Sequence, residues 1–88
     1  GSVSLPELYL PPIQTGMRIL HLHSNVPGIV ANVSSIFASH GVNIIGQSLK
    51  TKDQVGYLVT EISGRVSDEL LAEIREVNET IKLRVVYP

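Results

Sequence analysis

The residues of this 88-residue chain that are best suited to bind a ligand or a metal are histidines and asparagines near two predicted turns. His21 and His23 are two residues apart, and side chains at that spacing share one face of an extended strand. A His-x-His pair is a known zinc-ligand spacing, but a third ligand is needed, from His40 or from a partner chain. A zinc sensor built on His21, His23 and His40 is therefore a minor alternative. We expect His21 and His23 to be ordinary surface or interface histidines.

The turn from His23 to Gly28 has the composition of a binding site. Free backbone N–H groups at the start of a helix attract carboxylates, and a glycine such as Gly28 lets a ligand approach the backbone closely. His23 and Asn25 can present donors and acceptors at the same place. The structural alternative is that Asn25 only caps the helix and His23 only ends the strand.

Asn43 is the second candidate, because it follows the helix-ending Gly41 and begins an apolar stretch. Asparagine at such a position usually completes a turn. Its side chain also offers an acceptor and two donors without net charge. This suits a zwitterionic amino acid, whose ammonium group needs acceptors and whose carboxylate needs donors.

Several functions are excluded by what the sequence lacks. Without cysteine there is no disulfide, no thiolate metal site and no cysteine nucleophile. No nucleophile stands with a base and an orienting group, and Gly41 and Gly46 do not make a phosphate loop. The net charge is −1 and no apolar run approaches the roughly 18 residues of a membrane span. RNA-recognition domains need stacking aromatic and basic residues on their third strand, but the segment 55–61 has one aromatic residue and one acid. We expect a cytoplasmic domain without nucleic-acid or membrane partners.

The apolar pattern predicts six elements. Strands are predicted at Met17–His23, 42–50, Gly56–Ile62 and Ile81–Tyr87, and helices from Val26-Pro27-Gly28 to His40-Gly41 and from Ser67 to Val77. With right-handed crossovers, the order βαββαβ predicts an α+β, ferredoxin-like fold. That fold has a four-stranded antiparallel sheet with both helices on one face.

Charge is distributed unevenly along the chain. No charged residue occurs from Ile19 to Leu49, whereas 13 occur in the 39 residues from Lys50 to Pro88. In the predicted fold the strand 42–50 is an outer edge, and an uncharged apolar edge invites pairing with another chain. We therefore expect edge-to-edge dimerisation through strand 42–50. A merely tolerated edge is the alternative.

Two motifs resemble the C-terminal ACT domain of the D-3-phosphoglycerate dehydrogenase family. They are Ile19-Leu20-His21-Leu22-His23-Ser24-Asn25-Val26-Pro27-Gly28 and Ile36-Phe37-Ala38-Ser39-His40-Gly41-Val42-Asn43-Ile44. The segments 5–11, 55–60 and 80–87 agree with the same family, so the resemblance covers nearly the whole chain. It implies an ACT regulatory domain at residues 17–88. Residues 1–16 would then be an added Gly-Ser pair and the linker from a catalytic part.

The resemblance also implies a function. In that family the ACT domain binds L-serine, the end product of the pathway, and slows the dehydrogenase. Two domains join their sheets side by side, with serine at the junction. The implied effector site comprises His23, Asn25, Pro27, Gly28 and Ile29 of one subunit and Asn43 and Ile44 of the other. The catalytic domains and their NAD lie outside this chain, so we expect no catalytic residue, no metal and no cofactor in it.

The sequence departs from the family at two points. One glycine, Gly16, precedes the first strand where the family often has two, and Val26 stands where some members have a basic residue. Polar groups aimed at the serine hydroxyl should reject alanine, since they would lose their partner. The alternative is an ACT module that only assembles subunits and binds no effector.

Overall fold

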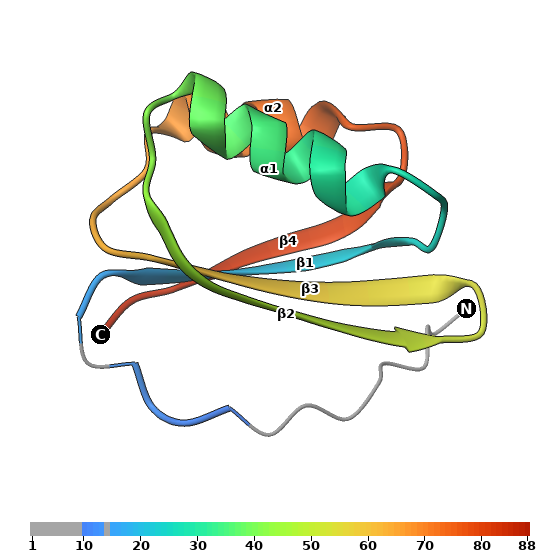
Figure 1. The fold of residues 1–88 in the computed structure, drawn as a ribbon, viewed down its shortest axis with the longest axis horizontal. Coiled ribbons are helices and arrows are strands. Elements are labelled where there is room, and N and C mark those ends of the chain that lie inside the picture. The colour runs from blue at the N-terminus through green and yellow to red at the C-terminus, as the bar shows by residue number, and fades with distance from the viewer. Residues whose placement is uncertain (1–9, 14) are drawn as a thin grey trace.

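A computed structural model describes residues 10–13 and 15–88. The elements within these residues are β1 (Met17–Ser24), α1 (Ile29–Ser39), β2 (Ile44–Lys52), β3 (Val55–Ile62), α2 (Asp68–Glu76) and β4 (Thr80–Val86). The four strands form one sheet in the order β2-β3-β1-β4, and every neighbouring pair is antiparallel. Both helices lie on the same face of the sheet (Figure 1). The predicted α+β, ferredoxin-like fold is confirmed, with β2 as an outer strand.

The core lies between the sheet and the two helices. Alternate residues of β1, beginning with Met17 and Ile19, face this layer, as the period-two pattern predicts. They pack with the apolar stripes of the helices, including Phe37 of α1 and Leu70 of α2, both fully buried. The apolar residues repeated along the helices and those repeated along the strands therefore pack into one core.

The opposite face of the sheet is also largely closed to solvent in its centre. Leu20, Leu22 and Val59 are at most 9% exposed although they point away from the helices. Residues 10–13 run along this side (Figure 1). At one end of the face Arg18, 6% exposed, forms an ion pair with Glu61 at 2.7 Å.

The start of α1 differs from the prediction. The helix begins at Ile29, so Pro27 precedes it and does not occupy its first turn. Gly28 is the N-cap, with a left-handed φ of 86° that favours glycine. No side chain caps this helix, so the alternative that Asn25 only caps it is wrong. In α2, by contrast, Ser67 is the predicted N-cap and accepts a hydrogen bond from the Leu70 N–H at 3.1 Å.

The second strand is shifted along the chain by two residues. We predict it at 42–50, but β2 spans Ile44–Lys52, because Val42 still bonds back to the end of α1 at Phe37. Ile45 forms an irregularity in the pairing with β3. The hairpin turn is correspondingly short, with Asp53 at a φ of 56°. The predicted lead-in at 1–16 falls mostly outside the described residues.

Gly16 makes a fixed turn immediately before β1. Its φ is 74°, and a Cβ atom there would collide with the carbonyl oxygen of Ile62. A side chain at this position is therefore excluded both by conformation and by space. None of the described helices is long and apolar enough to cross a membrane.

Candidate functional site

The two histidines of β1 are buried under the helices. His21 is 1% exposed and His23 is 0% exposed, and their ring centroids are 5.1 Å apart. The expectation of ordinary surface histidines is therefore wrong. Both lie on the same strand face as Met17 and Ile19, so the alternation that builds the core also carries the two imidazoles into it.

The hydrogen bonds of His21 assign its tautomer. Thr80 Oγ1 donates to the carbonyl oxygen of Ile74 at 2.6 Å and lies 2.7 Å from His21 Nε2. Since a hydroxyl has one proton, Thr80 must accept from His21, which places the imidazole proton on Nε2. His21 Nδ1 is then a bare acceptor, and it is buried with no partner among the described residues. Burial, and secondarily the His23 charge, lowers the pKa of His21 to about 4.

His23 has the opposite tautomer. Its Nδ1 lies 3.0 Å from the carbonyl oxygen of Ser24, which can only accept, so Nδ1 carries the proton. In the neutral ring His23 Nε2 is then a lone-pair acceptor, and it too is buried without a partner in the described structure. The ring lies against Gly56 of β3, where a Cβ atom would collide with Cε1 and stand 2.9 Å from Nε2. Only glycine leaves room for this ring.

The turn after β1 brings Asn25, Pro27, Gly28 and Ile29 to the same end of the sheet as His23. Asn25 is exposed, and its backbone N–H donates to Gln54 at 2.8 Å. Its side chain makes no hydrogen bond to any described residue. A Cβ atom on Gly28 would meet nothing within 4 Å, so the space beside the helix start is open. The first turn of α1 contains no acidic residue. The positive end of its dipole is thus available to an anion.

Asn43 and Ile44 lie at the other end of the sheet. Ile44 pairs with Ile62, whereas His23 pairs with Gly56 on the same strand β3. Six residues of antiparallel strand separate these positions by about 20 Å. Asn43 is exposed and Ile44 is half-buried against the core. Within one chain, therefore, the predicted site residues form two separate groups, and only the His23 group converges.

His40 does not join the other two histidines. It follows α1, and its Nε2 lies 2.7 Å from a carboxylate oxygen of Glu73 on α2. No three potential ligands among His, Cys, Asp and Glu come together in the described part of the chain. The zinc alternative therefore lacks its third ligand from the described residues of one chain.

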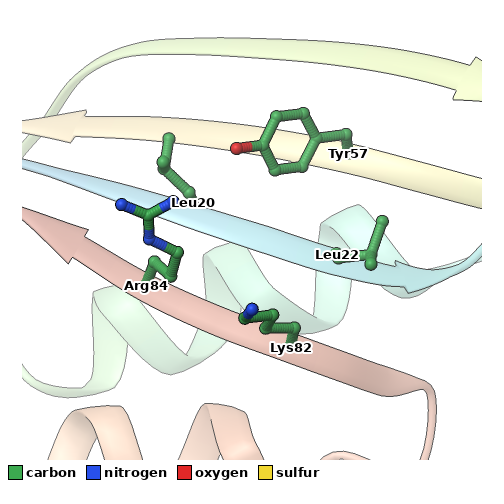
Figure 2. Close-up of a pocket in the computed structure, with 5 residues that line it drawn as sticks. All are labelled: Leu20, Leu22, Tyr57, Lys82 and Arg84. Carbon is green, nitrogen blue, oxygen red and sulfur yellow. The ribbon is translucent and has the colours of Figure 1, made fainter. Parts of the chain in front are cut away.

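A groove lies on the face of the sheet away from the helices. Its volume is about 70 Å³, and it is lined by Leu20, Leu22, Tyr57, Lys82 and Arg84 (Figure 2). Neither Lys82 nor Arg84 has an ion-pair partner among the described residues. The groove offers cations and apolar wall, but the Tyr57 hydroxyl is its one side-chain acceptor. It therefore suits the ammonium group of an amino acid poorly, and the His23 turn is the better candidate.

Two residues that support the histidines were not predicted from the sequence. Gly56 makes room for the His23 ring, and Thr80 holds His21. A glycine inside a strand otherwise rich in β-forming residues is a signal for close approach of another group, so the role of Gly56 is predictable in kind. Thr80 carries no such signal, because its role depends on the meeting of β4 with the end of α2.

Comparison with known proteins identifies the family of this fold. Residues 19–82 match the family described as AHAS small subunit-like ACT domain. The chain belongs to the ACT-domain family. ACT domains are regulatory modules that generally bind amino acids. The fold of this one resembles the ACT domain of GTP pyrophosphokinase from Chlorobium tepidum, with a TM-score of 0.69 at 16% identity over 82% of this chain and 97% of that one. It also resembles E. coli aspartokinase III in complex with lysine and aspartate, with a TM-score of 0.54 at 20% identity over 83% of this chain and 17% of that one.

Curated relatives are similar in sequence over nearly the whole ACT chain. D-3-phosphoglycerate dehydrogenase of Haemophilus influenzae is 37% identical over 99% of this chain and 21% of its own length. The enzyme of Dictyostelium discoideum is 34% identical over 99% of this chain and 21% of its own. The chain thus spans about a fifth of the length of these relatives, whose catalytic part lies outside the matching region.

Proposed function

We propose that this ACT domain senses L-serine as the feedback effector of a D-3-phosphoglycerate dehydrogenase. The observations that carry the proposal are the buried, unpartnered Nε2 of His23 at the end of β1 and the uncapped start of α1, which follows β1 in the chain. A buried acceptor without a partner costs on the order of 1–3 kcal/mol. A ligand that donates a hydrogen bond there would recover that cost.

The two ends of an amino acid match the two halves of this site. The carboxylate is placed at the first turn of α1, near Gly28 and Ile29, where backbone N–H groups and the helix dipole favour an anion. The ammonium or hydroxyl group donates to His23 Nε2. Asn25 offers both a donor and an acceptor beside them, and its exposed side chain is not engaged as a helix cap.

Asn43 reaches this site only from a second chain. A two-fold axis perpendicular to the sheet pairs β2 with β2 of the partner in antiparallel fashion and keeps all four helices on one face. Because the partner strand runs in the opposite direction, its Asn43 end lies at the His23 end of the first chain. The edge strand supports such pairing: Ile45 and Leu49 are 59% and 43% exposed, and β2 has no charge before Lys50.

Calorimetric titration of the 88-residue protein with L-serine and L-alanine tests the effector. We expect heat from serine and at least tenfold weaker binding of alanine, because polar groups aimed at the hydroxyl lose their partner with alanine. Equal affinity for the two amino acids would overturn the assigned site. No heat from serine, together with an intact dimer, would instead support a module that only assembles subunits.

Asparagine variants test the cross-chain geometry. Replacing Asn25 or Asn43 by alanine should each weaken serine binding, and Asn43→Ala should also weaken association measured by sedimentation. Asn78→Ala is the matched control, since Asn78 is exposed in the turn after α2. If Asn43→Ala changes neither serine affinity nor association, Asn43 has no role across the interface.

The relatives support a proposal about the parent protein. We infer a cytoplasmic NAD-dependent dehydrogenase whose catalytic domains precede this one and are slowed when serine draws two ACT domains together. Regulation of this kind requires serine to favour the less active arrangement, typically by about 1–3 kcal/mol.

A further inference from the structure

We propose that Thr80 fixes the tautomer of His21 by hydrogen bonding, and that the His21 ring supports the His23 ring by packing, so that this relay links the end of α2 to His23. His21 is thus a positioning residue of the effector site. Its effect on affinity rests on the proposed function, whereas the relay itself is independent of any ligand.

The relay consists of two directed hydrogen bonds followed by one contact between imidazole rings. The hydroxyl of Thr80 donates to the carbonyl of Ile74 at 2.6 Å, which belongs to the last turn of α2. Thr80 then accepts from His21 Nε2 at 2.7 Å, and the His21 ring packs against the His23 ring at 5.1 Å. Every proton position in this relay is set by a neighbour that can only accept or has already donated.

The fixed tautomer of His21 sets which of its ring nitrogens is a donor and which is an acceptor. With its proton directed to Thr80, His21 presents a lone pair at Nδ1 and has no N–H left to offer His23. Burial lowers the pKa of His21 to about 4, so the ring is neutral near pH 7, in agreement with one proton at Nε2.

The His23 ring is held from three sides. Ser24 accepts from its Nδ1 at 3.0 Å, Gly56 leaves it no freedom on the strand side, and His21 forms the remaining neighbour on β1. Two of these supports are backbone groups, one in the next residue and one on the neighbouring strand β3. The third, His21, depends on Thr80, which is anchored to Val77 through its own N–H at 2.9 Å. The junction between α2 and β4 therefore contributes to the geometry of a site two strands away from the dimer edge.

Side-chain nitrogen NMR spectra of the 15N-labelled protein at pH 7 test the relay directly. The signals are assigned with His21→Gln and His23→Gln. We expect His21 as the Nε2–H tautomer and His23 as the Nδ1–H tautomer. In Thr80→Val, which keeps the side-chain volume, His21 should become a mixture of tautomers, while Thr80→Ser should preserve the wild-type pattern. His40, which pairs with Glu73, is the internal control and should not change.

Serine affinity is the second measurement. Thr80→Val should weaken serine binding about tenfold, the effect of losing one net hydrogen bond, and Thr80→Ser should restore it to within twofold. Thr15→Val is the matched control on an exposed position. A wild-type His21 protonated at Nδ1, or a Thr80→Val protein with unchanged His21 signals, overturns the relay. If wild-type protein binds no serine, the effector assignment fails, and the tautomer spectra still decide the relay.

Discussion

Acidification should destabilise this domain through His21 before its carboxylates are protonated. Burial, and secondarily the His23 charge, lowers the pKa of His21 from 6.5 to about 4 in the folded chain. The unfolded chain takes up a proton near pH 6.5, and the folded chain resists it until about pH 4. Stability from this group is therefore complete above pH 6.5 and is lost as the pH falls through that window.

The magnitude follows from the shift. Each pKa unit corresponds to about 1.4 kcal/mol, so the full shift corresponds to about 3 kcal/mol. Because the titration is incomplete at pH 4 and solvent screening lowers such energies, we expect about 2 kcal/mol between pH 7 and pH 4. For a small domain, whose total stability is about 5–15 kcal/mol, this is a large fraction.

Urea denaturation followed by circular dichroism from pH 7 to pH 4 measures the effect. His21→Gln removes the titrating group but keeps a donor for Thr80, so its free energy of unfolding should fall about 2 kcal/mol less than that of the wild type over this range. Asn78→Ala, which replaces an exposed residue without a titratable group, should retain the wild-type slope. Parallel curves for wild type and His21→Gln, or an NMR titration of His21 near pH 6.5, would refute the reasoning.

Three further predictions follow from single contacts. Gly56→Ala should displace the His23 ring, destabilise the fold by about 1–3 kcal/mol in urea denaturation and weaken serine binding at least tenfold in calorimetry. Ser67→Ala should cost about 1 kcal/mol in the same denaturation assay through loss of the N-cap, and unaltered stability would contradict the capping role. Ile45→Lys on the β2 edge should dissociate the dimer in sedimentation, whereas Ile81→Lys, at a comparably exposed position on β4, should not.

The fold was predictable because its signals are local and mutually consistent. The alternation of β1, the cap at Ser67 and the left-handed Gly41 each point to the same element order that the structure has. The errors fall where tertiary contacts override local preference. α1 starts after Pro27, since Gly28 takes a left-handed conformation, and β2 starts late because Val42 bonds to the helix end.

The residue types of the site were predictable from the sequence, but their burial and hydrogen bonds were not. The turn from His23 to Gly28 is where the sequence places it, at the junction of β1 and α1. The sequence did not predict that both histidines are buried. Polar residues are usually exposed, and the sequence alone does not show which face of β1 packs against the helices. Thr80 was missed for a similar reason, since β4 and β1 are far apart in sequence and meet only in the sheet.

The separation of the site residues within one chain has a consequence for how an effector must act. His23 and Asn43 lie about 20 Å apart along the strands, so neither half alone surrounds a small zwitterion. If serine contacts both groups, it binds the dimer better than the monomer, and by linkage it must strengthen association by the same factor. The apparent serine affinity should therefore rise with protein concentration through the range in which the dimer forms, and sedimentation with saturating serine should move that range downward. An affinity independent of protein concentration, in a sample shown to pass from monomer to dimer, would mean that one chain holds the effector by itself.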